Sequence, residues 1–67
     1  MNKKITVYMK SGNKYVHFSE CIDERDILNA MKSNVVGLET YNGGFATYNR
    51  ADIERIEIHG NEKVEEL

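Results

Sequence analysis

Residues 3–20 read KKITVYMKSGNKYVHFSE and predict a β-hairpin. Apolar and polar residues alternate on both sides of a short polar centre, which is the period of a half-buried strand. The centre contains Gly12 and Asn13, which can supply the positive φ angles of a two-residue loop. The apolar residues of the two arms are Ile5, Val7, Met9, Val16 and Phe18.

A two-residue loop also sets the register of this hairpin. It pairs Met9 with Val16 and Val7 with Phe18, so apolar side chains meet on one face. We therefore expect all five apolar side chains of the hairpin in the core. The opposite, outward face would carry four polar or aromatic side chains, together with Thr6 and Ser19: Tyr8, Lys10, Tyr15 and His17.

Residues 19–34, SECIDERDILNAMKSN, predict a helix of about ten residues that is too short to persist without packing on a sheet. Asp23 is placed to cap its N-terminus by accepting from the backbone N–H of Asp26. The expected apolar stripe consists of Ile27, Leu28 and Met31.

Residues 35–48, VVGLETYNGGFATY, predict a second hairpin around Asn42-Gly43-Gly44. A two-residue loop would pair Leu38 with Thr47, whereas a three-residue loop with a bulge at Gly44 would pair Leu38 with Tyr48. The pattern does not choose between these registers, so the faces of Tyr41, Phe45 and Tyr48 stay open.

Residues 49–52 form a polar break, in which we expect one tight helical turn, and Ile53–His59 alternate as a last strand that Gly60 ends. The order strand, strand, helix, strand, strand, strand predicts an α+β fold: a small antiparallel sheet with one short helix on one face. A small curved barrel is the alternative. We expect residues 1–60 to form a single domain and residues 61–67 to be a frayed acidic tail.

Composition narrows the classes of protein. A chain of 67 residues is close to the lower size for a single core, so a homodimer that shares an interface stays open. Cys21, the one cysteine, makes no internal disulfide, and no apolar run reaches the length of a membrane span, so we expect a cytoplasmic protein. We interpret Cys21 as a small core residue. No metal-ligand spacing, phosphate loop or nucleophile–base set is recognisable, so we expect no cofactor, no metal and no enzyme activity.

Charge is unevenly distributed along the chain. Residues 1–19 carry four lysines and no acid, whereas residues 20–67 carry five basic and eleven acidic side chains. Tyrosine is favoured at protein interfaces, so we predict a protein-binding module with no membrane partner, contacting another protein or a second copy of itself. The candidate contact residues are Tyr8, Lys10, Tyr15, His17, Tyr41 and Tyr48. The alternative is binding of single-stranded nucleic acid by the same basic, aromatic hairpin.

The plan of a KITVYMKSGNKY hairpin, a short capped helix and a closing IERIEIHG strand resembles short uncharacterised accessory proteins of Gram-positive phages, prophages and mobile elements. The resemblance covers the general plan of the chain and no specific motif. It implies a non-enzymatic accessory or inhibitory role against a host protein, and it assigns no site residues.

Overall fold

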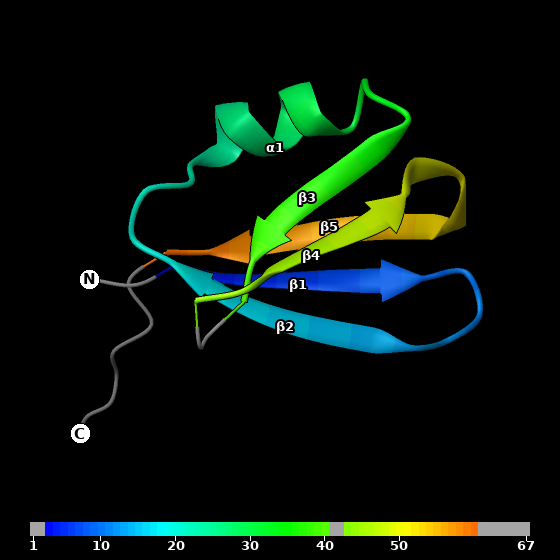
Figure 1. Ribbon diagram of the computed structural model, residues 1–67, viewed down its shortest axis with the longest axis horizontal. Helices are drawn as coiled ribbons and strands as arrows, with labels where there is room; N and C mark the ends of the chain where they lie inside the picture. The colour runs from blue at the N-terminus through cyan, green and yellow to red at the C-terminus, as the bar shows by residue number, and fades with distance from the viewer. Residues whose placement is uncertain (1–2, 41–42, 61–67) are drawn as a thin grey trace.

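The computed structural model describes residues 3–40 and 43–60, and within them the predicted order of five strands and one helix is confirmed (Figure 1). The fold is α+β, and the described strands do not close into a barrel. Tyr41, Asn42 and the expected tail at residues 61–67 lie outside the described residues. The elements are β1 (Lys3–Met9), β2 (Lys14–Ser19), α1 (Glu24–Ala30), β3 (Val35–Glu39), β4 (Phe45–Asn49), the 3₁₀ turn η1 (Arg50–Asp52) and β5 (Ile53–His59).

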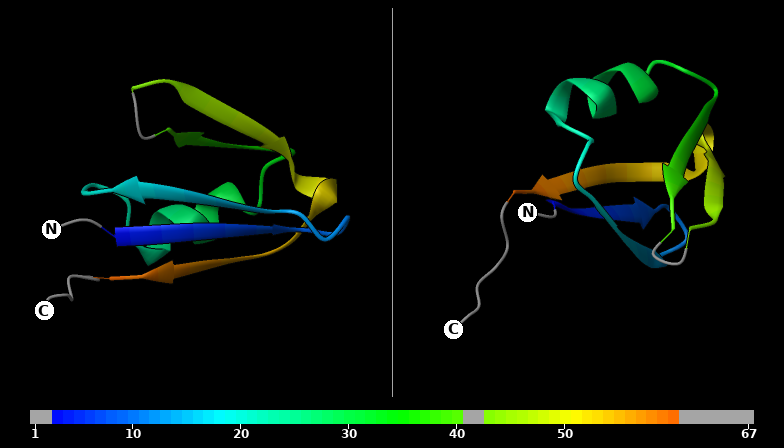
Figure 2. Two further views of the ribbon diagram at one scale, coloured as in Figure 1. Left: turned by 90° about the horizontal axis from the view of Figure 1, so that it is seen from below. Right: turned by 60° about the vertical axis from the view of Figure 1, so that its left-hand side comes forward.

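The strands form two antiparallel sheets instead of one. The first has the order β2-β1-β5, and the second consists of β3 and β4. The left view of Figure 2, seen from below, shows α1 behind the three-stranded sheet and the β3–β4 hairpin beside β2. In the same view from below, none of the described elements lies in front of β2, β1 and β5. One face of the three-stranded sheet is therefore covered, and the other is open.

The core lies between the covered face of this sheet, α1 and the β3–β4 hairpin. The side chains of β1 that face it, Ile5 and Val7, are fully buried. Burying a side chain of this size contributes about 1.5–3 kcal/mol. The whole buried apolar cluster is Ile5, Val7, Ile27, Val36, Leu38 and Ile53.

The first hairpin has a three-residue loop, so the predicted register is wrong. The Met9 N–H donates to the Asn13 carbonyl (2.9 Å), and the Gly12 N–H donates to the Met9 carbonyl (2.9 Å). Gly12, the third loop residue, has a φ of 100°. These contacts define a turn followed by a glycine bulge. Ile5 consequently pairs with His17, and Val7 pairs with Tyr15 instead of Phe18.

The shift in register is an odd number of residues, which exchanges the two faces of β2. Val16 and Phe18 were expected in the core, but they lie on the open face with 44% and 43% of their surface exposed. His17 and Ser19 were expected outside, and both are buried. The face assignment on β1 is correct for Ile5 and Val7, and Met9 is partly buried.

The second hairpin repeats the loop of the first. The Thr40 N–H donates to the Gly44 carbonyl (3.0 Å), the Gly43 N–H donates to the Thr40 carbonyl (3.2 Å), and Gly43 has a φ of 90°. Leu38 pairs with Ala46, so neither predicted register is correct. Both registers failed because each placed the loop at least one residue too late in the chain.

Asp23 caps α1 as predicted, and it forms a full capping box with Asp26. The helix has seven residues, fewer than expected, because its last turn tightens into hydrogen bonds between residues three apart. The prediction that Leu28 belongs to the apolar stripe is wrong, because its side chain is 66% exposed. It lies about 100° around the helix from buried Ile27. Cys21 is exposed and is not a core residue. Within the described ranges, no helix has the length and apolarity needed to cross a membrane.

Candidate binding face

The uncovered side of the three-stranded sheet, here called the outer face, is a surface over which no described element lies. The strand registers arrange its side chains in three rows. Tyr8 lies between Lys14 and Arg55, buried Thr6 lies between Val16 and Glu57, and Lys4 lies between Phe18 and His59. Cross-strand neighbours of this kind lie about 5 Å apart and act as one surface.

Three side chains of this face contact one another: those of Tyr8, Arg55 and Glu57. The Arg55 guanidinium carbon lies 3.8 Å from the centroid of the Tyr8 ring, which is a cation–π contact. The Arg55 Nε donates to Glu57 Oε2 (3.0 Å), and the Tyr8 hydroxyl donates to Glu57 Oε1 (3.4 Å). The Tyr8 ring is therefore held flat against Arg55, and one side of it is already covered.

The charges in this cluster shift one another. Hydrogen bonds from Arg55, and then from His59 at 3.4 Å, hold the pKa of Glu57 below its usual value. The hydrogen bond to Glu57 in turn raises the pKa of Arg55. Both side chains are well exposed to solvent, so the pair orders the face more than it stabilises the fold.

The outer face is basic although the chain as a whole is acidic. Its paired residues include three cations, Lys4, Lys14 and Arg55, and the anion Glu57, which gives these three rows a charge of +2 with His59 neutral. A second carboxylate, that of Glu54, lies 3.7 Å from Arg55 and lowers the positive charge at that end of the face. The whole chain has a net charge of −2. The basic character is located beside two exposed apolar side chains, Val16 and Phe18, which is the composition of a contact surface.

His17 lies on the opposite side of β2, where it joins the two sheets. Its Nδ1 lies 3.0 Å from the Glu39 carbonyl oxygen, and its Nε2 lies 2.6 Å from the Tyr48 hydroxyl. Because a carbonyl oxygen only accepts, the neutral imidazole carries its hydrogen on Nδ1 and accepts from Tyr48 at Nε2. Burial raises the pKa of the Tyr48 hydroxyl, so the hydroxyl keeps its proton and can donate it to Nε2.

The six residues predicted from sequence are not brought together. Tyr8 lies on the outer face, and Lys10 is exposed in the first loop. Tyr15 packs on Tyr48 with ring centroids 5.6 Å apart, on the covered side of the sheet together with His17. The expectation that Tyr8, Tyr15 and His17 share one face is therefore wrong. Tyr41 lies outside the described residues.

Sequence reasoning missed most residues of the outer face. Arg55, Glu57 and His59 were not included because the predicted face was drawn from the first hairpin alone. Val16 and Phe18 were placed in the core because the loop was taken as residues 12–13, whereas the structure forms it from residues 10–12. The signal that could have found Arg55 is the alternation of the last strand, in which Arg55, Glu57 and His59 share one face as predicted.

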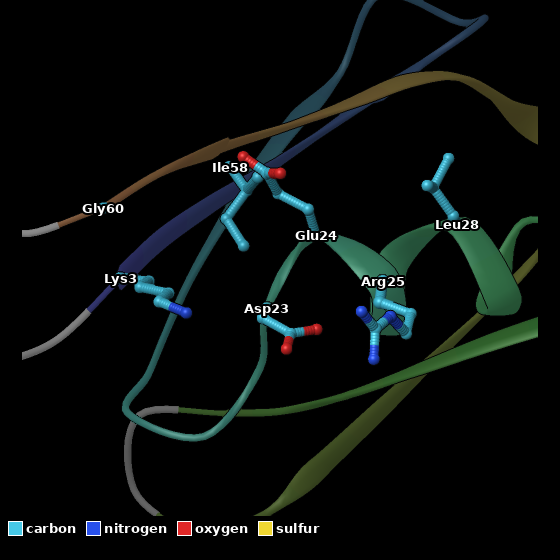
Figure 3. A pocket seen from close by; sticks show the side chains of 7 residues that line it. All are labelled: Lys3, Asp23, Glu24, Arg25, Leu28, Ile58 and Gly60. Atoms are coloured by element: carbon cyan, nitrogen blue, oxygen red, sulfur yellow. The ribbon is translucent and has the colours of Figure 1, made fainter.

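A second surface feature is an open hollow of about 520 Å³ between the start of α1 and the adjoining ends of β1 and β5 (Figure 3). Lys3 and Asp23 lie on facing sides of it, and Arg25 and Glu24 add one charge of each sign. Asp23 is already occupied by the capping box, which holds its pKa low. The balanced charges of this hollow favour no ligand class.

A metal site has no geometry to support it in the described part of the chain. No three His, Cys, Asp or Glu side chains among these residues lie close enough to hold a metal ion. Comparison with protein-family models, curated proteins and solved structures finds no match for this chain. A functional assignment therefore rests on the outer face and its surroundings.

Proposed function

We propose that this chain is a small non-enzymatic protein-binding module whose contact surface is the outer face of the three-stranded sheet. The observation that carries the proposal is the exposure of Val16 and Phe18 on a sheet face that no described element covers. A strand normally turns its apolar side chains to the core, and β2 does the opposite. A partner that covered these two side chains would remove the conflict.

The charge of the face indicates the kind of partner. Lys14 precedes Val16 on β2, and Lys4 pairs with Phe18 from β1, so the two apolar side chains have a cation beside each of them. An acidic protein surface that also carries apolar residues is complementary to this arrangement. The same charge opposes face-to-face pairing of two copies, because like charges would meet. An accessory or inhibitory role against a host protein, as the phage-type resemblance implies, is consistent with such a surface and forms part of this proposal.

The test is capture of a partner from a lysate of the source organism, with nuclease treatment, using the wild-type chain and two matched variants. Lys4→Glu/Lys14→Glu changes the charge of the outer face from +2 to −2, and Arg25→Glu/Lys32→Glu makes the same change on exposed residues of and just after α1. We expect the first variant to lose the partner and the second to retain it. Equal retention by both would refute the role of the outer face.

Binding of single-stranded nucleic acid is the second candidate, because the cations share the outer face with the rings of Tyr8, Phe18 and His59. The Arg55 contact covers one side of the Tyr8 ring and leaves less of it for base stacking. With three cations, the logarithm of the affinity should fall with the logarithm of salt concentration with a slope of about −2. Fluorescence anisotropy with labelled oligonucleotides measures this slope, and absence of binding at low salt would exclude the candidate.

A further inference from the structure

The open edge of β2 lies next to the outer face and shares two of its residues. β2 is an outer strand of its sheet and pairs only with β1. Met9 uses both its N–H and its carbonyl to bond the second arm, and such bonds alternate along an antiparallel pair. Tyr15 and His17 therefore direct their backbone groups to β1. Val16 and Phe18 direct theirs to the open edge.

These edge groups have no backbone partner in another element within residues 3–40 and 43–60. An edge of this kind is a template for a further strand. β2 lacks the usual protections against pairing over its second half, because Val16 to Ser19 carry no charge, proline or bulge. A charged side chain that opposes pairing with a further strand occurs only at the start of β2, at Lys14.

An open groove of about 500 Å³ lies along the end of this edge. One wall is formed by the end of β2 and the residues that follow it. The other is formed by the end of β3, the start of β4 and three described residues between them, Thr40, Gly43 and Gly44. Both walls carry an exposed ring: Phe18 is 43% exposed and Phe45 is 68% exposed. The Phe45 ring lies over Gly37, with its nearest carbons 2.6 Å from where a β-carbon of that residue would be. Two acidic residues, Glu20 and Glu39, line the groove together with these rings.

The groove differs in charge from the outer face. Glu20 and Glu39 both line it, and its described lining contains no Lys, Arg or His. A ligand that enters it is therefore favoured by a basic side chain, whereas the outer face favours an acidic one. An extended strand presents alternate side chains to opposite sides, so one strand can satisfy both surfaces.

We propose that the open edge of β2 binds an extended segment of a partner protein as an added strand. Its backbone pairs with Val16 and Phe18. Its side chains toward the outer face are apolar against Phe18, and its groove-facing side chains include an apolar residue against Phe45 and a Lys or Arg beside Glu20 and Glu39. This inference rests on the proposed protein-binding function and names the form in which the partner is recognised. Strand addition of this type derives affinity from the main chain and specificity from alternate side chains.

The probe is a display library of random peptides of about seven residues, the length of a common strand, selected on the immobilised full chain. We expect enriched peptides to alternate apolar residues and to carry Lys or Arg. Phe18→Thr and Phe45→Thr should each weaken the best peptide about tenfold. The control is Leu28→Thr on α1, an apolar residue about as exposed as Phe45, and it should leave binding unchanged. Glu20→Lys/Glu39→Lys should change the enriched charge from basic to acidic.

Backbone pairing is tested with the peptide itself. Two peptides are compared, one N-methylated at its odd residues and one at its even residues. One of them should lose binding and the other should keep it, because only every second amide faces β2. Three results would each overturn the inference. They are a selection that enriches no peptide, an equal loss of binding for both methylated peptides, and a dimer in sedimentation that depends on β2. If capture of a partner depends on Lys4 and Lys14 while no peptide binds the edge, the proposed function stands and the strand addition falls.

Discussion

His17 makes the register of the first hairpin testable by stability measurements. In the structure His17 is 5% exposed and its neighbour Val16 is 44% exposed, whereas a two-residue loop would reverse their positions. Replacing each of them by alanine therefore gives opposite rankings under the two registers. The comparison needs no knowledge of function.

The cost of His17→Ala follows from its contacts. The substitution removes the hydrogen bonds to the Glu39 carbonyl and the Tyr48 hydroxyl, each with a net contribution of about 1 kcal/mol. It also removes an edge-to-face contact with the Tyr48 ring, which contributes about 1 kcal/mol. We therefore expect a loss of about 3 kcal/mol, or about 12–24 °C in the melting temperature of a domain of this size. Val16→Ala removes two half-exposed methyl groups and should cost less than about 1 kcal/mol.

The assay is urea unfolding followed by circular dichroism, together with thermal melts. Tyr48→Phe should cost about 1 kcal/mol, and it should cost less in the His17→Ala background because the hydroxyl has already lost its acceptor there. A Val16→Ala loss larger than the His17→Ala loss would refute the register. Additive losses for His17 and Tyr48 would refute the bridge between them.

Three further predictions concern the loops, the second hairpin and the outer face. Gly12→Ala should lower stability by about 1–2 kcal/mol in urea unfolding, because the φ of 100° is unfavourable for a residue with a β-carbon although nothing crowds the site; an unchanged midpoint would contradict the loop geometry. Gly37→Ala should destabilise the wild type, because the added methyl group displaces the Phe45 ring. In the Phe45→Ala background the same change should stabilise by about 0.5–1 kcal/mol, since alanine is the better strand residue there. A change in the free energy of unfolding with the same sign in both backgrounds would disprove the contact. The pKa of Glu57 is lower in the folded chain, so its stabilising contribution is present above the pKa of the unfolded chain and is lost as pH falls through the folded pKa. Glu57→Gln should therefore make the free energy of unfolding fall less steeply with decreasing pH over this range. An unchanged fall in the variant would argue against the Arg55 and His59 bonds.

Alternation and turn chemistry predicted which elements form but not which side of β2 faces the core. Glycine occupies a positive-φ position in both a two-residue and a three-residue loop, so Gly12 and Gly43 mark where the chain turns without fixing the pairing. An error of one loop residue is enough to exchange the faces of a strand. The last strand, whose faces depend on no short loop, was predicted correctly.

The register that forms is held by contacts that a local pattern does not contain. Hydrophobicity favours Val16 and Phe18 inside, and nothing within residues 3–20 favours His17 there. The favourable contacts come from Glu39 and Tyr48, which follow His17 by 22 and 31 residues. Position 48 itself had no predicted face because the second loop was also ambiguous. The site could therefore not be located before both hairpins were in register.

This disagreement is itself the strongest reason to place function at β2. Elements whose local pattern and tertiary position agree, such as β1, β5 and the Asp23 cap, are explained by folding alone. β2 instead buries a histidine that needs two hydrogen-bond partners and exposes a valine and a phenylalanine on an open face and edge. Exchanging those faces would bury Val16 and Phe18 but would break the two His17 hydrogen bonds. Those bonds account for burying His17, and the exposed pair itself adds nothing evident to the isolated chain. A partner strand that covers both side chains and pairs with their backbone groups supplies a physical reason for the arrangement.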